Sequence, residues 1–247
     1  MNDVFTARGS MLIAGAKIDG SIADIAIDET GTIVEIGEGA RGAIDADIII
    51  DASDQIAIPG LVNTHTHAAM TLLRGYADDM PLQEWLSEKI WPLEAHLSGD
   101  DVYLGTRLAC LEMIMSGTIA FNDMYFFMDR AADAVDEMGL RATLAYGFID
   151  LGDETKREAE IVATETLVAD VKGRGNPRIK AAVGPHSVYT VSPEGLSWCA
   201  EFAEEQGIGV HTHLAETEKE VTDCVAEFGR RPAAHLDDCG CLTPRTV

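Results

Sequence analysis

Five short apolar segments, each followed by a longer stretch with helix signals, set the strongest limit on how this sequence can fold. The predicted strands cover residues 56–64, 118–125, 141–149, 179–189 and 208–214. Capping patterns mark helix starts at Ser98 with Asp101, at Ser192, and at Thr217 with Glu220. Because each helix returns the chain to the start of the next strand, this alternation predicts an α/β fold with a parallel sheet.

Residues 11–56 have a different pattern. Short β-branched runs, such as residues 32–36 and 48–50, are separated by Gly20, Gly31 and Gly37, which favour turns. This pattern predicts a small β-domain ahead of the strand–helix units. We therefore place a domain boundary after residue 56, with residues 57–247 forming the first five βα units.

The chain is strongly acidic, with 42 acidic and 18 basic side chains and a net charge of −24. Hydrophobic residues still make up 47% of the chain, which suffices for a packed core, so the charge does not indicate disorder. Such a surface repels phosphate backbones and anionic lipids, and no apolar run reaches the length of about 18 residues typical of a membrane span. We therefore expect a small-molecule partner, and neither nucleic acid nor membrane.

The predicted location is the cytoplasm. Met1, Asn2 and Asp3 lack the basic and then apolar start of a signal peptide. The excess of acidic residues exceeds what a small-molecule site needs. It is typical of a surface solvated in concentrated salt, where screening removes self-repulsion, so we expect a halophilic cytoplasm.

Histidines lie at the carboxyl ends of three predicted strands, where parallel α/β folds collect their functional residues. His65 and His67 end the first strand, His186 the fourth, and His213 the fifth. Residues two apart on a strand point to the same side, so His65 and His67 can reach one ion together, and His213 offers a third nitrogen ligand. The glycine pattern of a dinucleotide-binding fold is absent. Both an open doubly wound sheet and part of a (β/α)8 barrel collect functional residues at these ends, so both stay open at this point.

Glu216 follows His213 by three residues, where the last predicted strand gives way to a helix. A carboxylate at this place can exchange a proton with water that a metal activates, without itself binding the metal. His211 lies on the same strand, and for it both a structural role and a role in supporting a ligand stay open.

Several motifs occur in order along the whole chain and together resemble one family. They are residues 59–67, 70–75, 85–94, 184–186 and 213–217. The sequence resembles the amidohydrolase superfamily, and within it the methylthioadenosine/S-adenosylhomocysteine deaminase group, which includes the 5′-deoxyadenosine deaminases. The resemblance implies an incomplete (β/α)8 (TIM) barrel of the metal-dependent hydrolase type, with residues 1–56 as the N-terminal part of a β-sandwich domain.

The resemblance also implies roles for seven residues. They are His65, His67 and His213 as metal ligands, Glu216 as the catalytic proton carrier, and Glu94, His186 and Trp85 as substrate contacts. One divalent ion is implied, zinc or alternatively iron. The implied reaction is hydrolysis at a C–N bond of a cyclic amidine: 5′-methylthioadenosine, 5′-deoxyadenosine or S-adenosylhomocysteine would yield the inosine analogue and ammonia.

Two positions bear on the 5′ substituent. Close relatives in the group carry an arginine for the carboxylate of the homocysteine tail where this sequence has Tyr146. Arg157 is an alternative cation. Without a cation at this place, uncharged 5′ groups such as methylthio or plain deoxy are favoured over S-adenosylhomocysteine.

The resemblance covers five of the eight strands of such a barrel. A strand-six histidine and a strand-eight aspartate of the family have no counterpart, because His235 precedes the expected strand. We therefore expect a C-terminally truncated chain that lacks the full activity of its parent, which would be a homo-oligomer.

Two other functions stay open at this point. One is hydrolysis of another heterocycle, such as guanine or an s-triazine, although Glu94 and Trp85 favour a nucleoside. The other is an inactive metal-binding fragment.

Overall fold

The computed structural model describes residues 9–247, and the chain divides into two compact units between Pro59 and Gly60. The opening residues on which the predicted location rests lie outside this range. Within it, none of the helices is both long enough and apolar enough to cross a lipid bilayer.

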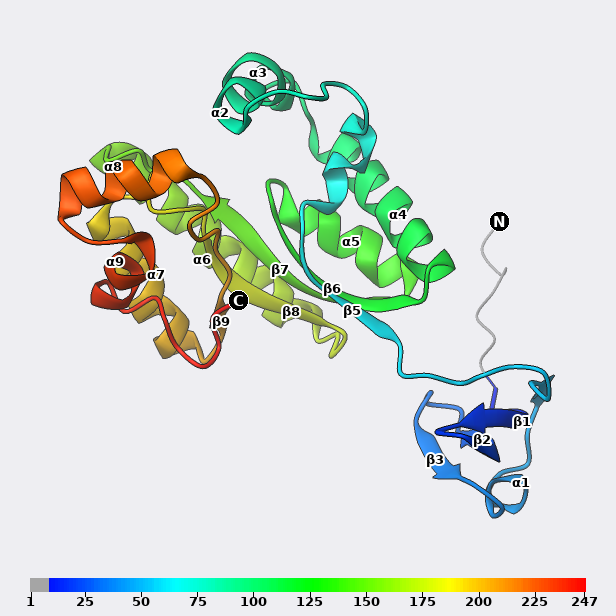
Figure 1. Cartoon of the computed structure of the whole chain (residues 1–247). Helices are drawn as coiled ribbons and strands as arrows, with labels where there is room; N and C mark the ends of the chain where they lie inside the picture. The colour runs from blue at the N-terminus through cyan, green and yellow to red at the C-terminus, as the bar shows by residue number, and fades with distance from the viewer. Residues whose placement is uncertain (1–8) are drawn as a thin grey trace. The chain divides into compact units, whose positions relative to one another are not determined.

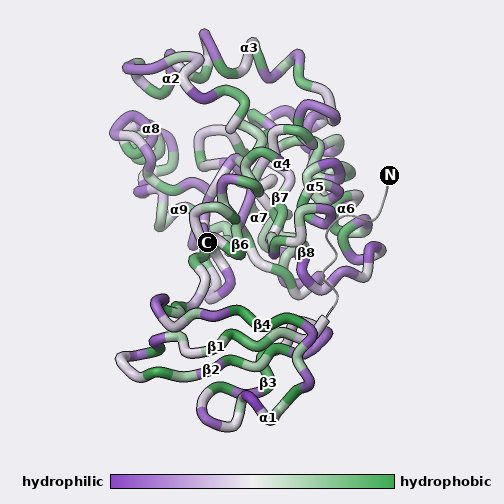
Figure 2. The backbone as a smooth tube through the Cα atoms, turned by 90° about the vertical axis from the view of Figure 1, so that its right-hand side faces the viewer, coloured by the Kyte–Doolittle hydropathy of each residue, from purple (hydrophilic) through white to green (hydrophobic). Residues whose placement is uncertain are grey.

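The first unit is built on a four-stranded sheet in the order β3-β2-β1-β4. Its elements are β1 (Met11–Ile18), β2 (Ser21–Ile27), β3 (Ile33–Ile36), α1 (Ala40–Ala43) and β4 (Ile48–Asp51). Strand β1 pairs antiparallel with β2 and parallel with β4. Leu12, Ala26 and Ala40 form its small core, and Figure 2 shows hydrophobic residues along β1, β2 and β4. That this sheet belongs to a β-sandwich stays a prediction.

The second unit contains a five-stranded parallel sheet in the sequential order β5-β6-β7-β8-β9. The strands are β5 (Leu61–Thr66), β6 (Thr118–Tyr125), β7 (Arg141–Phe148), β8 (Ile179–Pro185) and β9 (Gly209–Val210). Because the order never reverses, right-handed crossovers place the connecting helices on one face of the sheet. The sheet curls as a half-barrel (Figure 1), which confirms the expected α/β fold with an incomplete barrel.

Helices follow each strand of the half-barrel. They are α4 (Gly99–Met115), α5 (Met128–Met138), α6 (Glu154–Arg174), α7 (Pro193–Gln206), α8 (Glu218–Phe228) and α9 (Pro232–Asp238). The predicted caps at Ser98 and Ser192 are confirmed, since each side chain accepts a backbone N–H three residues later. Thr217 caps α8 in the same way. Two main clusters of buried residues lie between these helices and the sheet, one with Phe121 and Leu144 and the other with Val183 and Leu196.

A helical excursion separates β5 from α4. It comprises η1 (Ala68–Leu73), α2 (Leu82–Trp85), the π-helical turn η2 (Leu86–Ile90) and α3 (Trp91–Glu94). At Gly105, helix α4 packs so closely on η1 that an added Cβ would lie 2.5 Å from the Ala69 carbonyl oxygen. This contact needs glycine and fixes the segment that follows the β5 histidines.

Four predicted strands are shorter than expected, the third by its last residue alone. The first begins at Leu61 instead of residue 56, after Pro59, which lacks an N–H for strand pairing. The fourth ends at Pro185 for the same reason. Regular pairing on the fifth stops at Val210, and the chain then continues extended, with the N–H of His213 donating to the His186 carbonyl.

Candidate metal and substrate site

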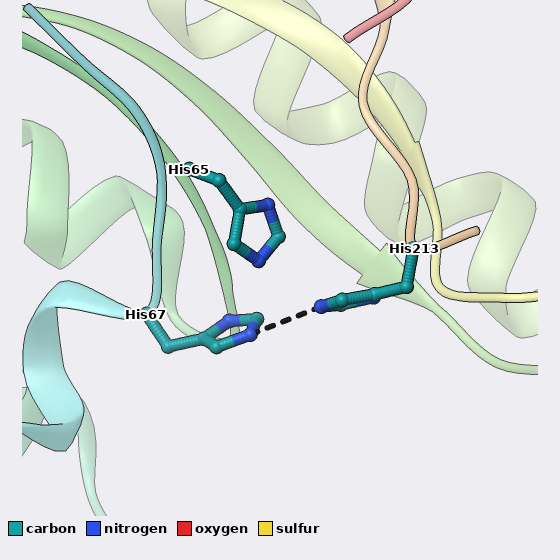
Figure 3. A group of neighbouring side chains, drawn as sticks. All are labelled: His65, His67 and His213. Carbon is teal, nitrogen blue, oxygen red and sulfur yellow. Dashed lines mark hydrogen bonds between the residues drawn. The ribbon is translucent and has the colours of Figure 1, made fainter. Parts of the chain in front are cut away.

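Three imidazoles converge at the carboxyl ends of the outermost strands of the half-barrel. His65 lies on β5, and His67 directly follows this strand. His213 follows β9, the strand at the opposite edge of the sheet. Figure 3 shows the rings pointing toward a common space. One nitrogen from each of the three rings lies within 4.8 Å of the other two, which is a spacing that one metal ion can bridge.

Backbone carbonyls fix which nitrogen carries the proton in two of these rings. The Nδ1–H of His67 donates to the Met124 carbonyl at 2.6 Å, and the Nδ1–H of His213 donates to the His186 carbonyl at 2.8 Å. A carbonyl oxygen only accepts, so both Nδ1 atoms must be protonated. In the neutral rings, each Nε2 then holds an unprotonated lone pair.

These two Nε2 atoms lie 3.1 Å apart, the approach drawn as a dashed line in Figure 3. Two neutral lone pairs repel at this distance, and a cation between them removes the repulsion. Tetrahedral zinc with Zn–N bonds of about 2.0–2.1 Å separates its nitrogen ligands by roughly 3.3 Å. The arrangement of His67 and His213 therefore fits a bound divalent ion of the zinc type.

His65 is held by a contact that the sequence left undecided. Its Nδ1 lies 2.7 Å from Nε2 of His211, a residue that is only 2% exposed. When the Nδ1–H of His65 donates this hydrogen bond to His211, Nε2 of His65 carries the lone pair that a metal ligand needs. His211 thus contacts the ring of His65 and supports it from inside the protein.

Burial disfavours the charged form of three histidines that line the site, His65, His67 and His186. It lowers the pKa of His67 to about 4, with a further lowering by the neighbouring His213 and His65. Burial also lowers the pKa of His65 and brings the pKa of His186 to about 3. Neutral imidazole is the form that binds a metal, so the rings of His65 and His67 are suited to bind one at neutral pH.

One cavity of about 370 Å³ brings together every residue for which the sequence predicted a role. Its lining includes His65, His67, His213, Glu216, Glu94, His186 and Trp85. The helical excursion after β5 supplies Trp85 and Glu94, whereas the ends of β5, β8 and β9 supply the others. The structure therefore places the predicted site residues around one space, while their individual roles remain proposals.

Glu94 is oriented by a residue that the sequence did not single out. The hydroxyl of Tyr125, at the end of β6, donates to Oε1 of Glu94 at 2.7 Å. Burial raises the pKa of Glu94, and this hydrogen bond partly counteracts the effect. Only the position of Tyr125 at a strand end could have indicated a site residue.

His186 and Trp85 are also held in place. Nδ1 of His186 lies 2.9 Å from the Thr190 hydroxyl and 3.1 Å from the Ser187 hydroxyl, which leaves its Nε2 for other partners. The indole N–H of Trp85 donates to the Ala77 carbonyl at 3.0 Å. Both side chains thus meet the cavity in fixed orientations.

A second cavity, of about 460 Å³, shares a wall with the first. The shared residues are Trp91, Glu94, Tyr125 and Phe126. The rest of the second lining is mostly apolar and includes Tyr146, whose pKa is raised by burial and then by the nearby Glu160 carboxylate. Arg157 lines neither cavity; it donates to Ser192 at 3.4 Å and lies 4.0 Å from Asp150.

The parallel half-barrel with a histidine cluster at its strand ends defines the class of metal-dependent α/β-barrel hydrolases. A profile of the amidohydrolase family matches residues 56–246, and the chain belongs to this family.

The proteins similar to this chain include two deaminases named for adenosine derivatives. The chain is 62% identical, over 99% of its length, to a 5′-deoxyadenosine deaminase from Methanoregula boonei. It is 46% identical, over 92% of its length, to a 5-methylthioadenosine/S-adenosylhomocysteine deaminase from Syntrophomonas wolfei. These matches cover 56% and 51% of the two relatives, so the chain spans about half the length of the proteins it resembles.

A solved structure shows the same similarity. An adenosine deaminase from Xanthomonas campestris with bound Zn superposes with a TM-score of 0.86 at 33% identity. The match covers 96% of this chain and 56% of the other.

Proposed function

We propose that this sequence belongs to a metal-dependent hydrolase that deaminates adenosine-type nucleosides. In the reaction, water adds to the amine-bearing ring carbon, the C–N bond to the amino group breaks, and the products are the inosine analogue and ammonia. The observation that carries the proposal is the 3.1 Å approach of the His67 and His213 Nε2 atoms, in the same cavity as Glu216 and Glu94.

His65, His67 and His213 would hold the ion, which we assign as a single zinc, with iron as the alternative. When bound, the ion supplies a Lewis acid that lowers the pKa of water toward neutrality. The three neutral imidazoles leave the ion its full positive charge. The hydrogen bonds from His67 to Met124 and from His213 to His186 keep the ligand nitrogens directed at it.

Glu216 is assigned the proton transfers. Its position in the cavity, three residues after His213, lets its carboxylate take a proton from water and deliver it to a ring nitrogen of the substrate. Because Glu216 is not one of the three converging ligands, it is free to change its protonation state during the reaction.

The substrate contacts support a nucleoside. Glu94 can accept hydrogen bonds from ribose hydroxyls, and its hydrogen bond from Tyr125 fixes its orientation. Trp85 offers an aromatic surface, and His186 presents Nε2 to the same cavity. A guanine or s-triazine ring has no ribose for Glu94 to bind.

An uncharged 5′ group fits the second cavity better than a homocysteine tail. Tyr146 lies in this cavity, and the carboxylate of Glu160 is close enough to raise its pKa. Arg157, the alternative cation, is engaged with Ser192 instead. Among the described residues that line this cavity there is no arginine or lysine, so a substrate carboxylate would find no paired cation there. 5′-Deoxyadenosine and 5′-methylthioadenosine are the proposed substrates, ahead of S-adenosylhomocysteine.

Ammonia release tests the proposal directly. We expect the zinc-loaded protein to release ammonia from 5′-deoxyadenosine and 5′-methylthioadenosine, faster than from S-adenosylhomocysteine and without turnover of guanine or an s-triazine. The 247-residue chain is expected to show less than full activity, since it spans about half of its relatives. Zinc binding without any ammonia release would make this chain a metal-binding fragment, and preference for guanine would overturn the nucleoside assignment.

We also propose a cytoplasmic location in concentrated salt, a nucleoside as the only partner class, and homo-oligomerisation of the full-length protein. The net charge of −24 supports the first two, because it disfavours nucleic acids and anionic membranes and is best tolerated where salt screens it. Unfolding in high salt combined with stability in low salt would overturn the salt assignment.

A further inference from the structure

The backbone between His213 and Glu216 has to depart from the regular alternation of an extended strand if both side chains are to line one cavity. Residues 211–213 continue β9 in extended form: the N–H groups of His211 and His213 donate toward β8, whereas that of Thr212 donates to Val247 on the other side. Side chains alternate along an extended chain, so His211 and His213 both face His65. With continued alternation, Glu216 would point away from them.

The chain reverses at Ala215. Its φ of +53° lies in the left-handed region, which a residue with a Cβ rarely occupies without support. This single residue breaks the alternation, and Glu216 consequently lines the same cavity as the histidines. Something must hold Ala215 in this conformation.

Glu220 supplies that support. Its Oε1 accepts the N–H of Ala215 at 3.0 Å, and its Oε2 accepts the N–H of Glu216 at 2.7 Å. Glu220 as a residue is only 2% exposed, so these hydrogen bonds to its carboxylate are shielded from water. The two oxygens thus grip the two consecutive N–H groups that flank the reversal.

An ordinary capping box in the same protein shows how unusual this is. At α4, Asp101 accepts the N–H of its own N-cap residue, Ser98, at 2.8 Å. At α8, Thr217 caps Glu220 in the expected way, but the Glu220 carboxylate reaches past Thr217 to the two residues before it. The longer glutamate side chain is therefore used to shape the loop ahead of the helix.

We propose that Glu220 is a positioning residue that acts through Glu216: it stabilises the reversal at Ala215 and so directs the Glu216 carboxylate into the histidine cavity. The inference rests on the proposed function for the role of Glu216 in proton transfer. Glu220 itself touches neither the converging imidazoles nor the space between them.

Amide hydrogen exchange tests the two hydrogen bonds of Glu220 without requiring catalytic activity. In the deuterated, ¹⁵N-labelled chain, we expect Glu220→Gln to move the Ala215 and Glu216 amide resonances upfield and to speed their hydrogen exchange by about tenfold or more. A glutamine keeps one acceptor but turns an NH₂ group toward the other N–H. The control Asp101→Asn removes a cap carboxylate elsewhere and should leave both amides unchanged. Unchanged amides in Glu220→Gln would overturn the proposal.

Kinetics then separates positioning from general stability. We expect Glu220→Gln to keep its zinc affinity within about threefold and its KM within about threefold, while kcat falls by about 100-fold, the effect of misplacing a reactive group by about 1 Å. In a Glu216→Gln background, Glu220→Gln should lower kcat no further. An additive loss would show that Glu220 acts independently of Glu216 and would overturn the proposal.

Failure of the proposed function and failure of the variant to fold can each be distinguished from failure of the positioning role of Glu220. If the zinc-loaded wild-type chain releases no ammonia, the proposed function fails for this chain, and the amide measurement alone decides the role of Glu220. If Glu220→Gln does not fold, Glu220→Asp takes its place, because it keeps the charge but falls short of the loop by one methylene group. We expect it to show the same faster exchange, and wild-type exchange in Glu220→Asp would overturn the proposal.

Discussion

The two sides of the histidine cluster reach the cavity in different ways. On the β5 side, His65 and His67 follow from strand geometry, since residues two apart face the same way. On the β9 side, His213 obeys the same rule, but Glu216 reaches the cavity only because the chain reverses at Ala215. A regular strand is enough to align the proposed metal ligands, whereas directing the proposed proton carrier Glu216 to the same cavity requires an irregular backbone and a residue to stabilise it.

The largest expected effect tests whether both sides contribute equally to metal binding. We expect His67→Ala and His213→Ala each to lower zinc affinity by roughly 100- to 1,000-fold, because each removes one nitrogen ligand. Competition with a chromophoric chelator measures the affinity, and the exposed His96→Ala serves as the control. If the two losses of zinc affinity differ by more than about tenfold, one side of the cluster contributes more to metal binding than the other.

A smaller effect is expected behind the ligands. His211→Ala should lower zinc affinity by about 10- to 100-fold, because His65 loses the partner that fixes its ring. Isothermal titration of the metal measures the change. An unchanged affinity would mean that His65 is positioned by strand β5 alone, which would sharpen the contrast between the two sides.

Acid should weaken the metal-free protein through His67. Its pKa of about 4 lies below the ordinary value of 6.5, so the unfolded state takes up protons first as the pH falls. The stability that its neutral ring contributes is present above about pH 6.5 and is lost as the pH falls toward 4, amounting to roughly 2 kcal/mol between pH 7 and pH 5. Urea unfolding at both pH values checks this, and His67→Gln should show a smaller pH dependence than the wild type.

The smallest effect concerns the ordinary cap. Asp101→Asn should cost about 0.5–1 kcal/mol of stability, since it weakens a capping box on the protein surface. Its zinc affinity should match that of the wild type, as judged by the same chelator assay. A change in zinc affinity would indicate that loss of the α4 cap also alters η1 and the histidines at the end of β5.

The sequence was sufficient where structure depends on local pattern. It predicted the α/β class and the caps of α4, α7 and α8, because periodicity and capping act over a few residues, whereas the incomplete barrel was expected from the family resemblance. It missed the contact between His211 and His65, and that between Tyr125 and Glu94, because these pairs lie 146 and 31 residues apart. The grip of Glu220 on the loop was hidden by a pattern identical to that of an ordinary capping box.

The 3.1 Å approach of the His67 and His213 Nε2 atoms has a consequence for the stability of the folded protein. Any ion that enters this space binds the folded chain and not the unfolded one, so its concentration becomes a term in the folding equilibrium. At a free concentration 1,000 times the dissociation constant, that term is about 4 kcal/mol, a large share of the total stability of a typical domain. The abundance of the folded protein in the cell would then follow the supply of the metal as well as the rate of synthesis.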